Sequence, residues 1–334
     1  MNKLLSVIIT VLMLSCNNDK QIIIPEIKGN IVFFNGLAET LSVLDIPENR
    51  VYNNVQITGM WPNHLVLTDT IILVNSGDNS ISLYDDKDLH KTKEIYLGSG
   101  KNPWMTFPLP NTDFLYISCY ISDEVIKVNK QSGEILKAIK VGKNPEGGCL
   151  INNRLYIGNT TSNSISIINT LDDTIEKTVN LRDIIPNRIF NPQSIIPFKE
   201  REEIHVICTG ENSTGVSDGV VIILNSKSLQ LKSTIEVGGS PIFADGGINF
   251  SKKLVYLHGT TGLGAYNYET YKKIGITTVF DNIFISGLLF IPETNKIYLS
   301  NFAKDEIYIL NGDSYNHEET IQASDGVQQL IYIR

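Results

Sequence analysis

Histidine and cysteine side chains are the first candidates for chemistry in this sequence, because they bind metal ions and activate nucleophiles. Their spacing argues against both roles. No two histidines stand at a metal-ligand spacing, no Cys-x-x-Cys pair occurs, and phosphate-binding loops and serine-nucleophile motifs are missing. We therefore predict strand or surface histidines and small buried thiols. These residues are His64, His90, His205, His258 and His317, with Cys119, Cys149 and Cys208.

Carboxylates offer a second route to chemistry. Glu146 and Asp123 could collect a cation or act as an acid and a base, but an acidic surface carries such groups in any case. The chain has 334 residues, 19% of them charged, and a net charge of -8, which argues against a surface that grips nucleic-acid phosphates. We expect no metal, no cofactor and no nucleic-acid partner.

The N-terminus is typical of a signal peptide over residues 1–15, with Lys3 before an apolar run that ends at Leu14. That run is too short to span a bilayer, which needs about 20 apolar residues. Plain secretion and an uncleaved anchor remain the alternatives to a lipid anchor.

Cys16, followed by the polar Asn17, resembles the lipidated first residue of a bacterial lipoprotein. The resemblance implies lipidation at Cys16, a tether over residues 16–29 and a place in the cell envelope. The outer membrane is favoured, because Asn17 stands where inner-membrane lipoproteins of this type have Asp. The leaflet that the protein faces stays open.

A turn followed by an alternating strand recurs along the rest of the chain. Clear copies are Asn35–Asp45, Asn75–Asp85 and Asn159–Asn169. Each copy closes on Asp or Asn, and the closing residues are 40 to 44 positions apart, except for one interval of 56. Self-similarity at this period indicates stacked supersecondary units. The closing residues are Asp45, Asp85, Asn129, Asn169, Asn225, Asn267 and Asn311.

Each unit predicts four short strands rich in Ile, Val, Leu and Tyr. In the second unit we expect them at 63–68, 71–75, 80–85 and 91–97. Four strands in about 40 residues are typical of a propeller blade. We therefore predict an all-β fold, a single seven-bladed β-propeller over residues 30–334.

The two ends of this domain complement each other. The first unit lacks its innermost strand, and one extra strand, 327–333, stands after the seventh unit without further strands of its own. We predict that the C-terminal strand completes the first blade, because an open ring would leave an unpaired strand edge.

The stretch Ile72–Asp85, followed by Ile95–Pro103, resembles the YVTN repeat family. That repeat runs Tyr-Val-Thr-Asn, a turn, Thr-Val-Ser-Val-Ile-Asp, a strand and a Gly-x-x-Pro linker. The resemblance covers residues 30–334 and implies a propeller of the bacterial envelope type. Its Asn and Asp residues form turns by bonding to nearby backbone, so the motif implies a fold and no reaction.

Strands alternate in direction within a blade, so the linkers between blades and the turns between second and third strands emerge on one face, here called the linker face. Both tryptophans lie in adjacent linkers there. Exposed indoles suit a flat ligand or a protein partner, although they also fill space between blades. The candidate binding residues are Trp61, Asn63, Asn102, Trp104, Tyr120, Glu146, Arg188, Gln193, Phe243 and His258.

The resemblance to envelope propellers implies a non-enzymatic, extracytoplasmic binding protein, a monomeric propeller that presents the linker face to an envelope protein or a small molecule. Two alternatives remain. Lipoprotein propellers that this chain resembles capture vitamin B12 for a transporter, and an indole pair suits a corrinoid ring. The other alternative is a propeller enzyme of the lactonase or lyase kind.

Overall fold

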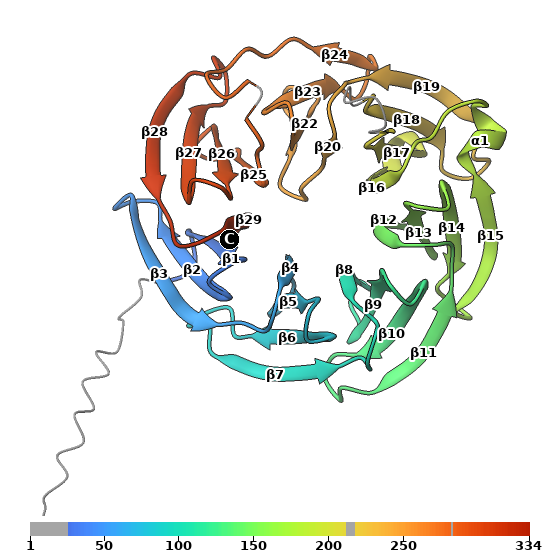
Figure 1. Cartoon of the computed structure of the whole chain (residues 1–334), viewed down its shortest axis with the longest axis horizontal. Coiled ribbons are helices and arrows are strands. Elements are labelled where there is room, and N and C mark those ends of the chain that lie inside the picture. The colour runs from blue at the N-terminus through green and yellow to red at the C-terminus, as the bar shows by residue number, and fades with distance from the viewer. Residues whose placement is uncertain (1–25, 212–217, 282) are drawn as a thin grey trace, which may run out of the picture.

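The computed structural model describes residues 26–211, 218–281 and 283–334. Figure 1 shows seven antiparallel sheets arranged as blades around a central axis. The all-β class and the seven-bladed propeller predicted from the repeat are therefore confirmed. In the described part of the chain, no helix has the length and apolar character needed to cross a membrane.

Blades 1 to 4 follow the predicted repeat. In blade 2 each strand begins and ends within one residue of its predicted bounds. The strands are, in blade 1, β29 (Val327–Tyr332), β1 (Ile31–Asn35), β2 (Thr40–Asp45) and β3 (Arg50–Ile57); in blade 2, β4 (Pro62–Leu67), β5 (Ile71–Asn75), β6 (Ser80–Tyr84) and β7 (Lys91–Tyr96); in blade 3, β8 (Pro103–Pro108), β9 (Phe114–Cys119), β10 (Glu124–Asn129) and β11 (Ile135–Lys140); and in blade 4, β12 (Pro145–Ile151), β13 (Arg154–Asn159), β14 (Ser164–Asn169) and β15 (Thr174–Asn180).

Blades 5 to 7 include the departures from the repeat. The long interval before blade 5 contains a short helix, α1 (Leu181–Ile184), and η1 (Lys199–Arg201) is a single 3-10 turn. The strands are, in blade 5, β16 (Pro192–Phe198), β17 (Glu203–Cys208), β18 (Val220–Asn225) and β19 (Leu231–Glu236); in blade 6, β20 (Pro241–Ile242), β21 (Ile248–Asn249), β22 (Leu254–Gly259), β23 (Gly264–Asn267) and β24 (Lys272–Ile274); and in blade 7, β25 (Gly287–Ile291), β26 (Lys296–Asn301), β27 (Glu306–Asn311) and β28 (His317–Gln322).

The closing Asp or Asn of every unit shapes the turn between the third and fourth strands. In each case its side-chain Oδ1 accepts a hydrogen bond from a backbone N–H two or three residues later. A short side chain that satisfies the backbone in this way favours a tight turn. The turn-forming role expected for these residues is confirmed.

The asparagine that ends the second strand has a different role. Asn75 Nδ2 donates to Ser82 Oγ over 2.9 Å, and Asn159 Nδ2 donates to Ser166 Oγ over 2.9 Å. Both asparagines are fully buried, so an amide group left without this partner would destabilise the folded protein. The recurring Asn and Ser therefore hold neighbouring strands of one blade together.

The hydrophobic core is divided into layers between blades. Seven clusters of buried residues are found among the described residues, and each combines side chains of two adjacent blades. The cysteines Cys119, Cys149 and Cys208 are buried and unpaired within these layers, as predicted. Because each blade is covered on both faces only by its neighbours, stability depends on closing the ring.

The ring closes through the C-terminal strand. β29 pairs antiparallel with β1, with Val32 opposite Ile331, as predicted. Gln329 extends this closure to blade 2, because its side-chain amide accepts from Leu65 N over 2.7 Å and donates to Leu65 O over 3.0 Å. Ile27, inside the stretch interpreted as a tether, is fully buried with residues of blades 1 and 2.

Blade 6 has a broken innermost strand. β20 and β21 both pair with β22, and residues 243–247 between them leave the ladder. The Phe290 N–H of blade 7 donates to Gly246 O over 2.9 Å, which fixes the detour. Two adjacent glycines, Gly246 and Gly247, explain why a regular strand does not continue here.

Candidate functional site

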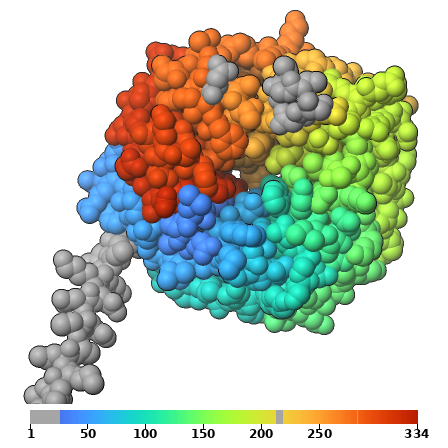
Figure 2. Space-filling model, viewed as in Figure 1, coloured from blue at the N-terminus to red at the C-terminus, as the bar shows by residue number. Residues whose placement is uncertain are grey.

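A cavity of about 170 Å³ opens at the axis, between the linker-face ends of the innermost strands. Figure 2 shows the opening at the centre of the ring. Half of the candidate residues line this cavity, and they come from blades 2, 3, 5 and 6. They are Asn63, Trp104, Gln193, Phe243 and His258.

Trp104 is supported by an aromatic neighbour. Its ring centroid lies 5.0 Å from that of Tyr120, with the planes tilted by 30°. Offset ring pairs of this kind hold an indole in one orientation. Asn63 Nδ2 donates to Trp104 O over 2.9 Å, so the neighbouring blade fixes the backbone as well.

Glu146 lies next to this aromatic pair and not in the cavity lining. Glu146 is 8% exposed, and this burial raises the pKa of its carboxyl to about 7. A hydrogen bond from Thr160 has a smaller effect in the opposite direction. Burial, helped by the charge of Glu146, also raises the pKa of Tyr120. Asp123, considered as its partner in acid–base chemistry, instead accepts the Asn144 N–H in the next linker over 2.9 Å.

Trp61 has an unusual backbone. Its φ is 53°, and its side chain is exposed, with 64% of the residue surface accessible. It stands directly before Pro62, where three other linkers have asparagine with φ between 49° and 53°. Asparagine tolerates this left-handed region, whereas a bulky aromatic residue rarely adopts it. Trp61 therefore departs from the repeat at a cost in stability, and its indole points into solvent.

Two other candidate residues have structural roles. Asn102 is one of the linker asparagines, and its Nδ2 donates to Ser76 O over 3.4 Å. Arg188 donates to both carboxylate oxygens of Glu236, over 2.6 and 2.9 Å, and its guanidinium lies 5.6 Å from the centre of the Phe190 ring. The bidentate pair fixes the loop that carries Arg188, and the bond to Ser76 O ties Asn102 to the turn of the preceding blade, so each residue has a structural role without a ligand.

The cavity also contains residues that we did not select from the sequence. His64 of β4 and Asp245 of the blade 6 detour both line it, and His64 Nε2 lies 3.7 Å from Asp245 Oδ2. Blades 2 and 6 are far apart in the ring order, so no repeat position links the two residues. The available signal was the Asp-Gly-Gly at 245–247, which breaks the expected innermost strand.

His258 is held in one tautomer. Its Nδ1 lies 2.9 Å from Ile285 O, and a carbonyl oxygen can only accept, so Nδ1 carries the proton. Burial lowers the pKa of His258 to about 4. At neutral pH the ring is uncharged, and its Nε2 is a hydrogen-bond acceptor.

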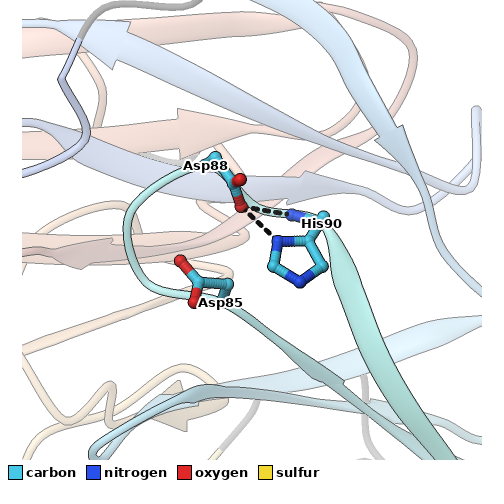
Figure 3. A group of neighbouring side chains, drawn as sticks. All are labelled: Asp85, Asp88 and His90. Carbon is cyan, nitrogen blue, oxygen red and sulfur yellow. Dashed lines mark hydrogen bonds and ion pairs between the residues drawn. The ribbon is translucent and has the colours of Figure 1, made fainter.

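A separate group of possible ligands lies on the opposite face. Asp85, Asp88 and His90 place one ligand atom each within 4.8 Å of one another, the sole such triple in the part of the chain that the structure describes. Figure 3 shows the His90 ring turned toward Asp88, which raises the pKa of His90. Asp85 accepts from Lys87 N and Asp88 from His90 N, so turn formation accounts for the grouping.

Comparison with known proteins identifies the fold alone. No family model and no curated protein matches the chain. Among solved structures it is similar to hydrazine synthase of Kuenenia stuttgartiensis (13% identity, TM-score 0.65, 80% of this chain and 88% of that chain). It is also similar to the dihydro-heme d1 dehydrogenase NirN in complex with DHE (8%, TM-score 0.62, 91% and 75%) and to a protein of unknown function from Desulfotomaculum acetoxidans (9%, TM-score 0.72, 92% and 100%). At such low identity the likeness is one of fold.

Proposed function

We propose that this protein is a lipid-anchored binding protein of the cell envelope, in the outer membrane, which holds a ligand or a protein partner on its linker face without converting it. The observation that carries the proposal is Trp61, a bulky aromatic residue that is kept in a left-handed conformation and exposed. Backbone strain of this kind is concentrated at functional sites.

The surroundings of Trp61 support a binding surface. Further exposed apolar side chains lie on the same face over blades 1 to 3, where strands end or linkers and turns begin, and exposed aromatic and aliphatic clusters mark interaction sites. They are Leu37, Ile57, Met60, Tyr96 and Ile121.

The direction of the first strand supports an orientation in which the linker face points away from the membrane. Gly29 and Asn30 hydrogen-bond with Ile333, the residue directly after β29, and β1 then runs toward the linker face, where residues 36–39 turn into β2. The chain thus enters the ring on the face opposite the linkers. A lipid anchor at Cys16 would leave the linker face directed away from the membrane.

The size of the cavity limits the corrinoid alternative. Pockets that enclose a drug-sized ligand have about 300 to 1,000 Å³, and this one has about 170 Å³. A corrinoid would have to lie over the mouth, stacked on Trp61 or Trp104. Pink protein after incubation with cobalamin, and colourless protein after changing both tryptophans to Ala, would establish that function in place of the general one.

The proposal is tested on the protein isolated from its own envelope. Native mass spectrometry should detect a bound mass in the wild type that is lost in Trp104→Ala and retained in Leu171→Ala, whose side chain lies on the opposite face. A bound mass that Trp104→Ala retains would contradict the proposal. Labelling with radioactive palmitate should mark the wild type and not Cys16→Ser; an unlabelled wild type would remove the anchor.

A further inference from the structure

The blade 6 detour places one charge in the axial cavity. Asp245 is the only residue of the described lining with a formal charge at neutral pH. Its side chain is 61% exposed, and the one ionic neighbour found for it among the described residues is His64. A lone carboxylate in a narrow mouth gives the cavity a negative potential, because the surrounding protein concentrates its field.

His64 lies beside this carboxylate in the cavity lining. Thr106 N donates to His64 Nδ1 over 3.4 Å, so in this tautomer the proton is on Nε2. That Nε2 is buried, on a residue that is 4% exposed, and it has no hydrogen-bond partner among the described residues. Its N–H side faces Asp245 Oδ2 at 3.7 Å, which leaves the second carboxylate oxygen for a ligand.

The remaining polar side chains of the lining are amides, a hydroxyl and His258, and they add no formal positive charge. His258 presents Nε2 as an acceptor, because Nδ1 donates to Ile285 O. Trp104 and Phe243 supply aromatic rings to the same lining, and such rings attract cations through their quadrupole. An anion would meet a carboxylate and aromatic faces, both of which repel negative charge.

We propose that this cavity binds a small organic cation, an ammonium or guanidinium group, with the Asp245 carboxylate as its counter-ion. The proposal rests on the proposed binding function and names the ligand chemistry of that site. A volume of about 170 Å³ accepts such a group from a free amine or guanidine, or from a Lys or Arg side chain of a protein partner.

The test compares a cation with its uncharged isostere on the full-length protein. Isothermal titration with methylguanidinium and methylurea, each up to about 50 mM, should give affinity for methylguanidinium at least about tenfold higher, as expected for a charge-assisted hydrogen bond. Asp245→Asn should abolish that difference. Asp325→Asn, an exposed carboxylate of the β28–β29 linker, should leave it unchanged, and equal melting temperatures of the variants exclude misfolding.

Equal binding of the two probes, no binding of methylguanidinium, or an unchanged preference in Asp245→Asn would overturn the inference. The tripeptide acetyl-Gly-Arg-Gly-amide assigns the source of the cation. Tighter binding than methylguanidinium points to a partner side chain, and weaker binding points to a free small cation. If Trp104→Ala loses the natural bound mass while Asp245→Asn retains it, the cation proposal fails and the binding function stands.

Discussion

Replacement of Trp61 by Asn should make the protein more stable and less able to bind. The position precedes the linker proline, and its backbone is left-handed in this linker as in three others. The other three linkers have an asparagine whose Nδ2 donates to a carbonyl of a second-to-third-strand turn, in two cases the turn of the preceding blade and in one case the turn of the following blade. Those asparagines are Asn102, Asn144 and Asn191.

The expected gain follows from three contributions. Removing a bulky residue from the left-handed region recovers about 1 to 2 kcal/mol, and the new amide hydrogen bond, to Gly36 O by analogy, adds about 1 kcal/mol. Trp61 is 64% exposed, so the indole covers only about 90 Å² of a full burial near 250 Å², and losing that contact costs about 2 kcal/mol. Trp61→Asn should therefore raise the free energy of unfolding by up to about 1 kcal/mol.

Urea unfolding followed by far-UV circular dichroism measures this change, since the variant has lost one of its two tryptophans. The midpoint should rise by up to about 0.3 M for a chain of this size. The matched control reverses the exchange at another linker. Asn144→Trp adds the strain and removes the hydrogen bond to Tyr120 O, so it should lower the free energy of unfolding by about 2 kcal/mol.

The binding half of the prediction uses the same variant. Trp61→Asn should retain less of the natural ligand or partner than the wild type does, despite its higher stability, as is common when a strained residue serves function. A midpoint that falls would refute the strain argument. Unchanged binding would remove Trp61 from the site.

Two further predictions concern stability. Burial raises the pKa of Glu146 to about 7, so the ionised carboxylate is disfavoured in the folded protein. The free energy of unfolding should therefore be highest below the carboxyl pKa of the unfolded chain and fall as the pH rises through the folded pKa. The expected loss is about 2 to 3 kcal/mol between pH 5 and pH 8. Glu146→Gln should lack this loss in unfolding curves at the two pH values, unlike the exposed control Glu134→Gln, and a variant with the same pH slope as the wild type would contradict it. Gln329→Ala removes two hydrogen bonds between blades 1 and 2 and should lower stability by about 1 to 3 kcal/mol, whereas deletion of 327–334 should unfold the whole ring; a truncated protein that melts like the full-length one would exclude closure by β29 as a source of stability.

The repeat made the fold predictable because each copy solves the same local problem. Asp85 and Asn169 form the same turn, and Asn75 and Asn159 bond to the same strand position, so a period in the sequence corresponds to a period in hydrogen bonds. The closure by β29 followed from counting strands. Blade 6 was predicted poorly, because its glycines replace the alternating pattern by a detour that only neighbouring backbone stabilises.

The site was predictable only where it follows the repeat. Asn63, Trp104 and Gln193 occupy equivalent positions after a linker proline, so the ring brings them to one axis. The approach of His64 to Asp245 depends on closure of the whole ring and on the detour, and neither is encoded in a local spacing. The structural roles of Asn102 and Arg188 likewise required knowledge of their partners across loops.

Site-specific photocrosslinking in cells tests the central claim most directly. A photoreactive phenylalanine analogue is placed at Trp61, Tyr96 or Ile121 on the linker face, and at Leu171 on the opposite face, all of them exposed positions. The account predicts a discrete crosslinked product from the linker-face positions and none from Leu171. Products of equal yield from both faces, or from Leu171 alone, would contradict it.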